Sequence, residues 1–326
     1  MTKKSLSKIE GKKPKVSILI PSYNQEDVIE QTLRSALLQT YENVEVIVSD
    51  DASTDKTPVI LEVWQALYPK KLKIFLHKDN LGVTENHTRG LLKCTGEYIT
   101  FLDGDDLFLP KKIERQVLFM QKNETCSICY HDVDVFDSET GSCLYLWSKR
   151  FGRREGNIKS LVRYGNYLPA VSVMVQRKHI PPQGYDAHIL VYSDWFLWLN
   201  ILNNGRGRIC YLEDVLAKYR RHIGNLTNTA RWKFVDQLLT LTLVETKWPY
   251  LAFFARMRRS EVQFMQAMNA LGTKKYGSVG PYFLDALMSG FPFLPWVRLI
   301  LREALFFFRN KAKSDDILKS ILLKKT

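Results

Sequence analysis

The sequence predicts an α/β fold in which a mostly parallel sheet is flanked by helices and followed by a helical C-terminal extension. Over the first hundred residues, short apolar runs alternate with amphipathic helical segments, and this alternation is typical of right-handed βαβ units. Three of the apolar runs end in polar or acidic residues, and ligands of parallel sheets bind outside the carboxyl ends of the strands. With 45% apolar and 12% aromatic residues among 326, the chain can bury one large core and a smaller appended unit.

The first three strand and helix units follow from residue type and spacing. The first run, KVSILIPSY, is compact and β-rich, and the next segment repeats apolar residues at helical spacing. The second run stops at Asp50 and Asp51, and turn and N-cap residues precede the next helix. The predicted elements are, in order, strand Lys15–Tyr23, helix Gln25–Gln39, strand Val44–Val48, helix Pro58–Leu67, strand Leu72–Leu76 and helix Val83–Lys93.

The fourth strand lies in Tyr98–Leu107, YITFLDGDDL, and delivers Asp103, Asp105 and Asp106 to its carboxyl end. Hard oxygen ligands of this kind suit Mg²⁺ or Mn²⁺. The alternative is an acidic turn that caps the helix predicted over Pro110–Met120, and for Asp106 capping is favoured. Because parallel strands end at one edge, four acidic residues are expected to share that rim: Asp50, Asp51, Asp103 and Asp105.

Four motifs in fixed order carry a family resemblance. They are PSYN from Pro21, SDDAS from Ser49, the NxG segment at Asn80 and LDGDD from Leu102. This set resembles family 2 glycosyltransferases, over roughly residues 15–225. The resemblance implies a GT-A (Rossmann-like) fold with a mixed, mostly parallel sheet, and an inverting transferase of the bacterial surface-polysaccharide type.

The resemblance also implies how the donor is held. Pro21, Tyr23 and Asp51 lie where the family cradles the nucleotide base, usually uracil, and an aromatic face with one acceptor suits that task. Glu26 would reach the ribose. Asp103 would contact the ribose and the metal, and Asp105 the metal, with Mn²⁺ or Mg²⁺ bridging the two phosphates of the donor.

The base that an inverting transfer requires is expected at Asp194. Residues 191–202 read VYSDWFLWLNIL and resemble the family's EDWxLWL segment, in which the aspartate takes the proton of the attacking hydroxyl. The preceding glutamate of the family is Ser193 here, which removes one negative charge. The alternative is that Asp194 is only a helix-start residue that favours the macrodipole.

A second segment, YRRHIGNLT from Tyr219, resembles the stretch that closes the family's core. His222 would be a third metal ligand, and Arg220 or Arg221 a phosphate clamp, since guanidinium matches phosphate geometry. The alternative for the histidine is a plain surface or packing role.

Charge and cysteine content suggest domain organisation and location. The five cysteines lack the spacing of zinc ligands, and we expect them to be free thiols in a reducing cytosol. The net charge is +13. The basic residues lie among large apolar residues and do not form a recognised nucleic-acid-binding motif. No 18-residue apolar window predicts a transmembrane helix. The expected domains are a basic tail at 1–14, a transferase domain at 15–230 with halves 15–106 and 107–230, and a basic amphipathic helical region at 231–326.

The C-terminal region has two interpretations. Its aromatic and basic segments, such as Tyr282–Phe308, are typical of a helix lying in the interface of an anionic membrane, which would place the protein on the inner face of the cell membrane. Alternatively, the region packs on the core or on a second subunit of a homo-oligomer.

Two function classes follow. The leading class is a metal-dependent transferase that moves a sugar from a nucleotide diphosphate donor, expected to be a UDP-sugar, to a glycan or lipid-linked acceptor. The alternative is a non-catalytic relative that binds nucleotide sugar or glycan as an assembly partner, and Ser193 keeps it open. A nucleotidyltransferase is a weaker third reading, because no glycine-rich phosphate loop follows the first strand.

Overall fold

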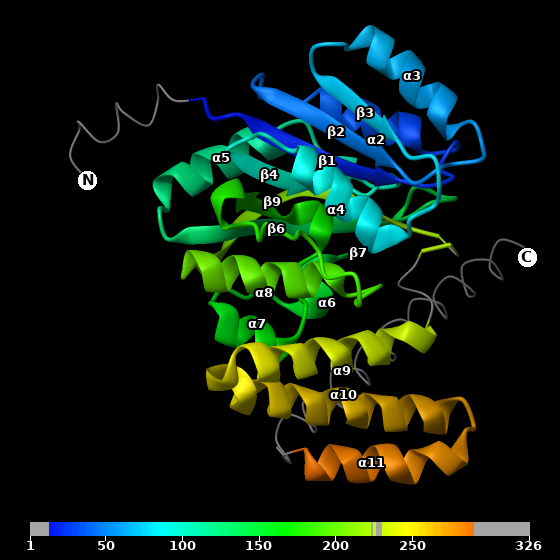
Figure 1. The fold of residues 1–326 in the computed structure, drawn as a ribbon, viewed down its shortest axis with the longest axis vertical. Helices are drawn as coiled ribbons and strands as arrows, with labels where there is room; N and C mark the ends of the chain where they lie inside the picture. The colour runs from blue at the N-terminus through cyan, green and yellow to red at the C-terminus, as the bar shows by residue number, and fades with distance from the viewer. Residues whose placement is uncertain (1–12, 223, 226–229, 290–326) are drawn as a thin grey trace, which may run out of the picture. The chain divides into compact units, whose positions relative to one another are not determined.

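The computed structural model describes residues 13–222, 224–225 and 230–289 (Figure 1). The chain divides into two compact units, Met1–Thr240 and Leu241–Thr326. The predicted basic tail at 1–14 lies almost wholly outside the described residues, as does most of the predicted membrane segment Tyr282–Phe308.

The N-terminal half of the first unit is a parallel βαβ series (Figure 1). Strands β2 and β4 pair with β1 on either side, and β3 pairs with β2, all in parallel. Each of the first three strands is followed by a helix, as the alternation predicts. The elements are β1 Val16–Ser22, α2 Ile29–Leu37, β2 Val44–Asp50, α3 Thr57–Leu67, β3 Leu72–Leu76, α4 Val83–Lys93 and β4 Tyr98–Phe101.

The second half of this unit adds an antiparallel part to the same sheet. Strand β8 runs antiparallel to β4 and β6, and β5 antiparallel to β9, whereas the long strands β6 and β9 are parallel. The elements are β5 Leu107–Phe108, α5 Lys112–Lys122, β6 Cys126–Asp137, β7 Cys143–Leu146, α6 Trp147–Phe151, α7 Ile158–Tyr164, β8 Met174–Gln176, α8 Ser193–Gly205 and β9 Arg208–Arg221, with short 3₁₀ turns at Ala170–Ser172 and Arg177–His179.

Among the described residues, the strands form one nine-stranded sheet in the order β3-β2-β1-β4-β8-β6-β9-β5, with β7 beside β6. Helices flank it (Figure 1). The predicted fold class, a mixed α/β sheet with flanking helices and further helices after it, is confirmed.

Close packing between α4 and the sheet depends on Gly90. A Cβ there would lie 2.6 Å from Leu19 Cδ1 and 2.9 Å from Ser49 Cβ. Next to it, the buried Asn86 amide donates to the carbonyl oxygen of Ser49 at 3.0 Å, and its oxygen accepts from the Ser49 hydroxyl at 2.7 Å. Helix α4 is thereby fixed against the carboxyl end of β2, where the candidate site lies.

The described part of the second unit, up to residue 289, is helical. Helix α9 (Ala230–Lys247) crosses the boundary between the units, and α10 (Ala252–Gly272) and α11 (Val279–Met288) follow, with 3₁₀ turns at Pro249–Leu251 and Tyr276–Ser278. The Ser260 hydroxyl donates to the carbonyl oxygen of Ala286 at 2.7 Å and so joins α10 to α11. Across residues 13–222, 224–225 and 230–289, none of the helices is both long and apolar enough to cross a membrane.

Candidate active site

The carboxyl ends of β1, β2 and β4 meet at one edge of the sheet. The pairing aligns Ser22 with Asp50, and the Ser22 hydroxyl donates to Asp50 Oδ1 at 2.8 Å. The backbone N–H of Leu102 donates to the carbonyl oxygen of Leu19 at 2.9 Å, so the acidic loop after β4 begins beside the end of β1. The topology therefore brings the acidic segments after β2 and β4 to a common edge.

Asp51 holds the loop in front of α4. Its carboxylate oxygens accept the N–H groups of Leu81 at 2.7 Å and Gly82 at 3.0 Å. Gly82 has φ 83° and ψ 158°, a conformation that is essentially restricted to glycine. A carboxylate has about four acceptor positions, so Asp51 keeps acceptor capacity for a further N–H, such as that of a nucleotide base.

The other residues predicted to hold the nucleotide are differently placed. Pro21 is buried within β1, whereas the Tyr23 side chain just beyond it is 47% exposed. Glu26 Oε2 accepts the N–H of Lys56 at 2.8 Å, and the Glu26 N–H donates to Asp55 Oδ2 at 3.0 Å. Glu26 thus makes hydrogen bonds to residues at the start of α3. Its contact with the ribose stays a prediction, and that contact would have to compete with the bond to Lys56.

Gly104 allows the acidic loop to approach β1. A Cβ at this position would lie 1.8 Å from Gln25 Oε1 and 3.0 Å from the carbonyl oxygen of Pro21. On the other side, the Thr32 hydroxyl lies 3.0 Å from the carbonyl oxygen of Gly104 and 2.9 Å from that of Asp106. The loop that carries the three aspartates is therefore packed tightly between β1 and α2.

Asp106 does not cap the following helix, so that expectation is wrong. Helix α5 begins at Lys112, and its N-cap residue Lys111 makes no side-chain capping bond. Asp106 is instead fully buried, and its Oδ1 accepts the backbone N–H of Arg220 at 2.8 Å. Burial and the neighbouring Asp105 and Asp103 raise the pKa of Asp106 well above its usual range. Its role is to join the acidic loop to β9.

Arg220 is a structural link rather than an exposed cation. It is 4% exposed, and its Nε donates to the carbonyl oxygen of Asp105 at 2.6 Å and its Nη2 to Gln31 Oε1 at 2.9 Å. A phosphate contact by Arg220 would have to replace these bonds. The guanidinium of Arg221 lies 5.9 Å from the ring centre of Tyr219.

Asp105 and His222 form the candidate metal position. Asp105 Oδ2 lies 2.8 Å from His222 Nε2, and the backbone N–H of His222 donates to Asn225 Oδ1 at 2.7 Å. Burial and Asp103 raise the pKa of Asp105, and the contact with His222 partly opposes that shift. Neighbouring ligands of an octahedral Mg²⁺ at about 2.0–2.1 Å lie about 3 Å apart, so this oxygen and this nitrogen fit a shared cation.

The described residues contain no group of three or more His, Cys, Asp or Glu side chains that could hold a metal ion. Asp103 is therefore not assembled with Asp105 and His222 as the three-residue set that the sequence predicts. Two protein ligands remain compatible with Mg²⁺, which usually retains waters and takes further oxygens from substrate phosphates.

Asp194 stands at the start of α8 and is half-buried. Its Oδ2 accepts from Asn166 Nδ2 at 2.9 Å, and its Oδ1 accepts the N–H of Trp195 at 2.7 Å. Burial raises the pKa of Asp194 to about 6; the two hydrogen bonds oppose the shift, and the charge of Asp103 adds to it. The charge of the acidic loop thus contributes to the raised pKa of Asp194, the expected base.

His87 and Asn166 belong to this site but were not predicted. His87 Nε2 lies 3.7 Å from Asp103 Oδ1, and the His87 ring packs edge-on against Tyr185 with centroids 5.3 Å apart. His87 follows Asn86 of the motif region by one residue, which is the sequence signal that could have indicated it. Asn166 follows α7 and carries no local signal, since its contact with Asp194 joins residues 28 positions apart.

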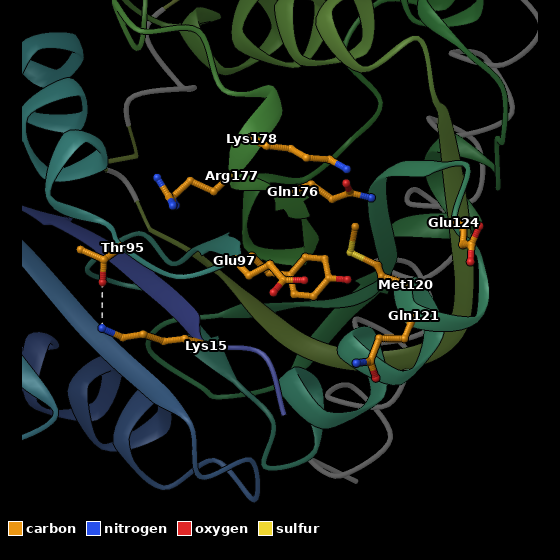
Figure 2. Close-up of a pocket in the computed structure, with 10 residues that line it drawn as sticks. Lys15, Thr95, Glu97, Met120, Gln121, Glu124, Gln176, Arg177 and Lys178 are labelled. Carbon is orange, nitrogen blue, oxygen red and sulfur yellow. Dashed lines mark hydrogen bonds between the residues drawn. The ribbon is translucent and has the colours of Figure 1, made fainter. Parts of the chain in front are cut away.

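A concavity at the opposite edge of the sheet contains none of the predicted site residues (Figure 2). It is lined by residues at the starts of β1 and β4, among them Lys15, Thr95 and Tyr98. Lys15 Nζ donates to the buried Glu45 at 2.7 Å and to Thr95 Oγ1 at 2.8 Å. Burial alone would raise the pKa of Glu45, but hydrogen bonds from Lys15, Ser17 and Thr95 outweigh it and lower the pKa to about 2. This network stabilises the sheet edge.

Comparisons with known proteins agree with the observed fold. The family described as Glycosyl transferase family 2 matches residues 17–168. An uncharacterized protein of Mycobacterium tuberculosis is 32% identical over 220 residues, which are 66% of this chain and 61% of the relative. The chain thus spans about six tenths of the length of that relative. An uncharacterized glycosyltransferase of Rickettsia typhi is 27% identical over 318 residues, 94% of this chain and 95% of the relative.

Two solved structures share the fold. S. aureus TarS 1–349 in complex with UDP-GlcNAc has a TM-score of 0.61 at 19% identity, covering 84% of this chain and 79% of that one. The mannosyltransferase PcManGT from Pyrobaculum calidifontis, in complex with GDP-Man and Mn²⁺, has a TM-score of 0.56 at 15% identity, covering 85% and 87%. Residues 17–168 of the chain thus match the family described as Glycosyl transferase family 2, on a fold that these two structures share.

Proposed function

We propose that this protein is an inverting glycosyltransferase that moves a sugar from a nucleotide diphosphate donor to a hydroxyl group of a glycan or lipid-linked acceptor. The observation that carries the proposal is the pairing of Asp194, with a pKa of about 6, and the acidic loop whose Asp103 acts on it electrostatically. A general base works best when its pKa lies near the operating pH. A carboxylate that served only to start a helix would gain nothing from such a raised pKa.

The donor site is proposed at the carboxyl edge of β1, β2 and β4. Tyr23, exposed and next to Pro21, would pack on the base, and Asp51 would accept one of its N–H groups. We propose a UDP-sugar as donor; the TarS complex with UDP-GlcNAc and the PcManGT complex with GDP-Man support a nucleotide sugar in general. Glu26 and Asp103 are proposed to contact the ribose. Arg220 or Arg221 is proposed to contact the diphosphate.

Asp105 and His222 are proposed to hold Mn²⁺ or Mg²⁺. The 2.8 Å separation of Asp105 Oδ2 and His222 Nε2 supports this pair, and so does the raised pKa of Asp105, whose ionised form a cation would stabilise. When bound, the cation would neutralise charge on the diphosphate leaving group.

The chain's own residues would carry the proton transfer. Asp194 takes the proton of the attacking acceptor hydroxyl, and the Asn166 amide holds the Asp194 carboxylate in one orientation through its 2.9 Å bond. Direct displacement by that hydroxyl inverts the anomeric centre, so an α-linked donor gives a β-linked product.

We further propose that the acceptor belongs to cell-surface polysaccharide and that the enzyme works in the cytoplasm at the inner face of the membrane. Helix α11 supports a peripheral contact, because four of its apolar side chains are exposed by 38–78%: Phe283, Leu284, Leu287 and Met288. The basic segments at both ends of the chain would add attraction to anionic lipids.

One observation favours the non-catalytic alternative. Ser193, buried at 6% exposure, stands where the family carries a glutamate, so the base lacks its charged neighbour. In that reading the site binds nucleotide sugar or glycan without turnover.

Incubation of the purified protein with Mn²⁺, a panel of UDP-sugars and a panel of glycan acceptors tests the proposal, with UDP release as the readout. Release that depends on metal and falls by orders of magnitude in Asp194→Asn supports a transferase. Donor binding without any release, or release unchanged in Asp194→Asn, favours the non-catalytic reading.

A further inference from the structure

Three of the five cysteines lie together where β6 and β9 begin. Cys126 is the first residue of β6 and Cys129 the fourth, and Cys210 is the third residue of β9. The thiol of Cys126 is hydrogen-bonded to the sulfurs of both Cys129 and Cys210, and all three residues are free thiols. This group is called the thiol cluster below. Spacing in the sequence does not indicate it, because Cys210 follows Cys129 by 81 positions.

The pairing of β6 with β9 places two of these thiols next to each other. The two strands are parallel neighbours in the sheet (Figure 1), and Cys129 is the register partner of Cys210. Register partners point to the same face of the sheet, and neighbouring strands lie about 4.8 Å apart. A disulfide needs a Cα separation of about 4.4–6.8 Å. Cys129 and Cys210 can therefore be joined with little movement of the backbone.

Cys126 contributes a third sulfur from an irregular part of β6. Residues three apart in a regular strand point to opposite faces, but the register shifts between Cys126 and Ile128, as at a β-bulge. Cys126 and Cys129 both belong to the core cluster against which Cys210 packs. Cys126 pairs with Arg208, two residues before Cys210, so its Cα is offset by about 6.6 Å along the strand. With the strand spacing added, Cys126 lies outside the range of a disulfide with Cys210.

The environment of Cys210 favours its thiolate, which is the reactive form of a cysteine. The hydrogen bond from Cys126 lowers the pKa of Cys210; burial and the charge of Glu155 oppose this shift, and the charge of Arg208 adds to it. Hydrogen bonds to Cys129 and Cys210 raise the pKa of Cys126, so Cys126 keeps its proton and acts as the donor. Cys210 is half-buried, whereas Cys126 and Cys129 are fully buried. A small oxidant therefore reaches Cys210 before the other two thiols.

The backbone around the thiol cluster is closely packed. A Cβ at Gly207, just before β9, would lie 2.0 Å from Ser127 Oγ and 2.9 Å from the carbonyl oxygen of Thr125. From α5, the Gln116 amide donates to the Cys129 sulfur at 3.7 Å and to the Cys129 carbonyl oxygen at 3.3 Å. Over the described ranges no three His, Cys, Asp or Glu side chains are grouped so as to hold a metal ion. The chemistry open to the thiol cluster is therefore that of thiols.

We propose that Cys210 is a site of reversible oxidation by hydrogen peroxide and that Cys129 converts the oxidised form to a disulfide between β6 and β9. First, the Cys210 thiolate attacks one peroxide oxygen: an S–O bond forms, the O–O bond breaks, and the hydroxide that leaves takes up the proton that Cys210 released. The Cys129 sulfur then attacks the resulting sulfenic acid: an S–S bond forms, the S–O bond breaks, and the Cys129 proton leaves with the oxygen as water. The two thiols lose two electrons, and the peroxide becomes two waters. A dithiol reverses the reaction.

The test maps every cysteine of the full chain by mass spectrometry after peroxide treatment, without donor, metal or acceptor. Protein reduced with dithiothreitol and freed of it is exposed to hydrogen peroxide, with dimedone in one arm to trap sulfenic acid. Remaining thiols are then alkylated before the unreduced peptides are analysed. Cys143, which is exposed, controls for accessibility, and Cys94, whose pKa burial raises to about 12, controls for a buried thiol. The variants are Cys129→Ala and Cys126→Ala, with Cys94→Ala as the matched control, and circular dichroism melting checks their folding.

In the wild type, Cys210 is expected to react at least about tenfold faster than Cys143 and to end in a disulfide with Cys129 that dithiothreitol removes. Cys129→Ala should leave Cys210 as the dimedone adduct without a disulfide. Cys126→Ala should slow the reaction of Cys210 at least about threefold, because the thiolate loses its donor, and Cys94→Ala should match the wild type. Slower reaction of Cys210 than of Cys143, a disulfide of Cys210 with another cysteine, or no intramolecular disulfide would overturn the proposal. The wild-type result decides this even where a variant does not fold.

Discussion

Replacing Asp194 with asparagine is expected to destroy activity while stabilising the fold at neutral pH. The pKa of Asp194 is raised from 3.8 to about 6, chiefly by burial. One pKa unit corresponds to about 1.36 kcal/mol, so keeping this carboxylate ionised costs the folded state up to about 3 kcal/mol at pH 7.5. Asparagine removes that cost but loses one acceptor, the one used by Asn166, which costs about 1 kcal/mol.

The pH dependence fixes the sign of this effect. A carboxyl group whose folded pKa lies above its unfolded value binds its proton more tightly when folded, so the cost is small near pH 4 and grows as the pH rises through about 6. The Asp194→Asn variant should therefore be more stable than the wild type by about 2 kcal/mol at pH 7.5 and about equally stable at pH 4.5.

Urea unfolding at pH 4.5, 6.0 and 7.5 measures the difference, followed by tryptophan fluorescence and circular dichroism. Asp27→Asn, an exposed aspartate ahead of α2, controls for the change in charge. In the wild type, turnover should rise about tenfold per pH unit below about 6 and level off above it. A stability difference that does not vary with pH, or a loss of turnover smaller than tenfold in Asp194→Asn, would refute the reasoning.

Three further predictions concern the loop before α4, the opposite sheet edge and the C-terminus. Gly82→Ala should cost about 1–3 kcal/mol, because φ is 83° there, and should weaken UDP binding through Asp51; thermal melting and titration check both. The lowered pKa of Glu45 stabilises the wild type above pH 4.5, and this stabilisation is lost as the pH falls toward about 2. Glu45→Gln should remove it, and acid unfolding measures the difference. Deleting residues 281–326 should release the protein from anionic liposomes in cosedimentation; undiminished binding would contradict a membrane role.

The sequence predicted the parallel half of the sheet well because each strand there is a short apolar run. Strand β2 occupies Val44–Asp50 against a predicted Val44–Val48, and β3 matches Leu72–Leu76. The antiparallel half was not predictable in the same way. Strands β6 and β9 pair across about eighty residues, and no local pattern encodes which distant run a strand will choose.

Within the candidate site, the position of a residue was predictable where one motif carries it. Asp103 and Asp105 lie in the loop after β4, where the motif predicts them, and the charge of Asp103 raises the pKa of Asp194. Their roles in binding and catalysis stay predictions. The misplaced expectations concern residues whose partners are distant in sequence. Asp106 accepts the backbone N–H of Arg220, 114 positions away, and the Arg220 side chain donates to Asp105 and Gln31. The tertiary structure decides which N–H group a buried carboxylate accepts, and the sequence of the loop alone does not predict that partner.

The most direct test of the central claim is isothermal titration of UDP into the purified protein with Mn²⁺, with Mg²⁺ and with EDTA, repeated for Asp105→Asn and Asp194→Asn. Metal-dependent UDP binding that is lost in Asp105→Asn and nearly intact in Asp194→Asn is the predicted result. Equal loss of affinity in the two variants would contradict the separate roles of metal ligand and base, and no binding of UDP under any condition would contradict a UDP-sugar site at this edge of the sheet.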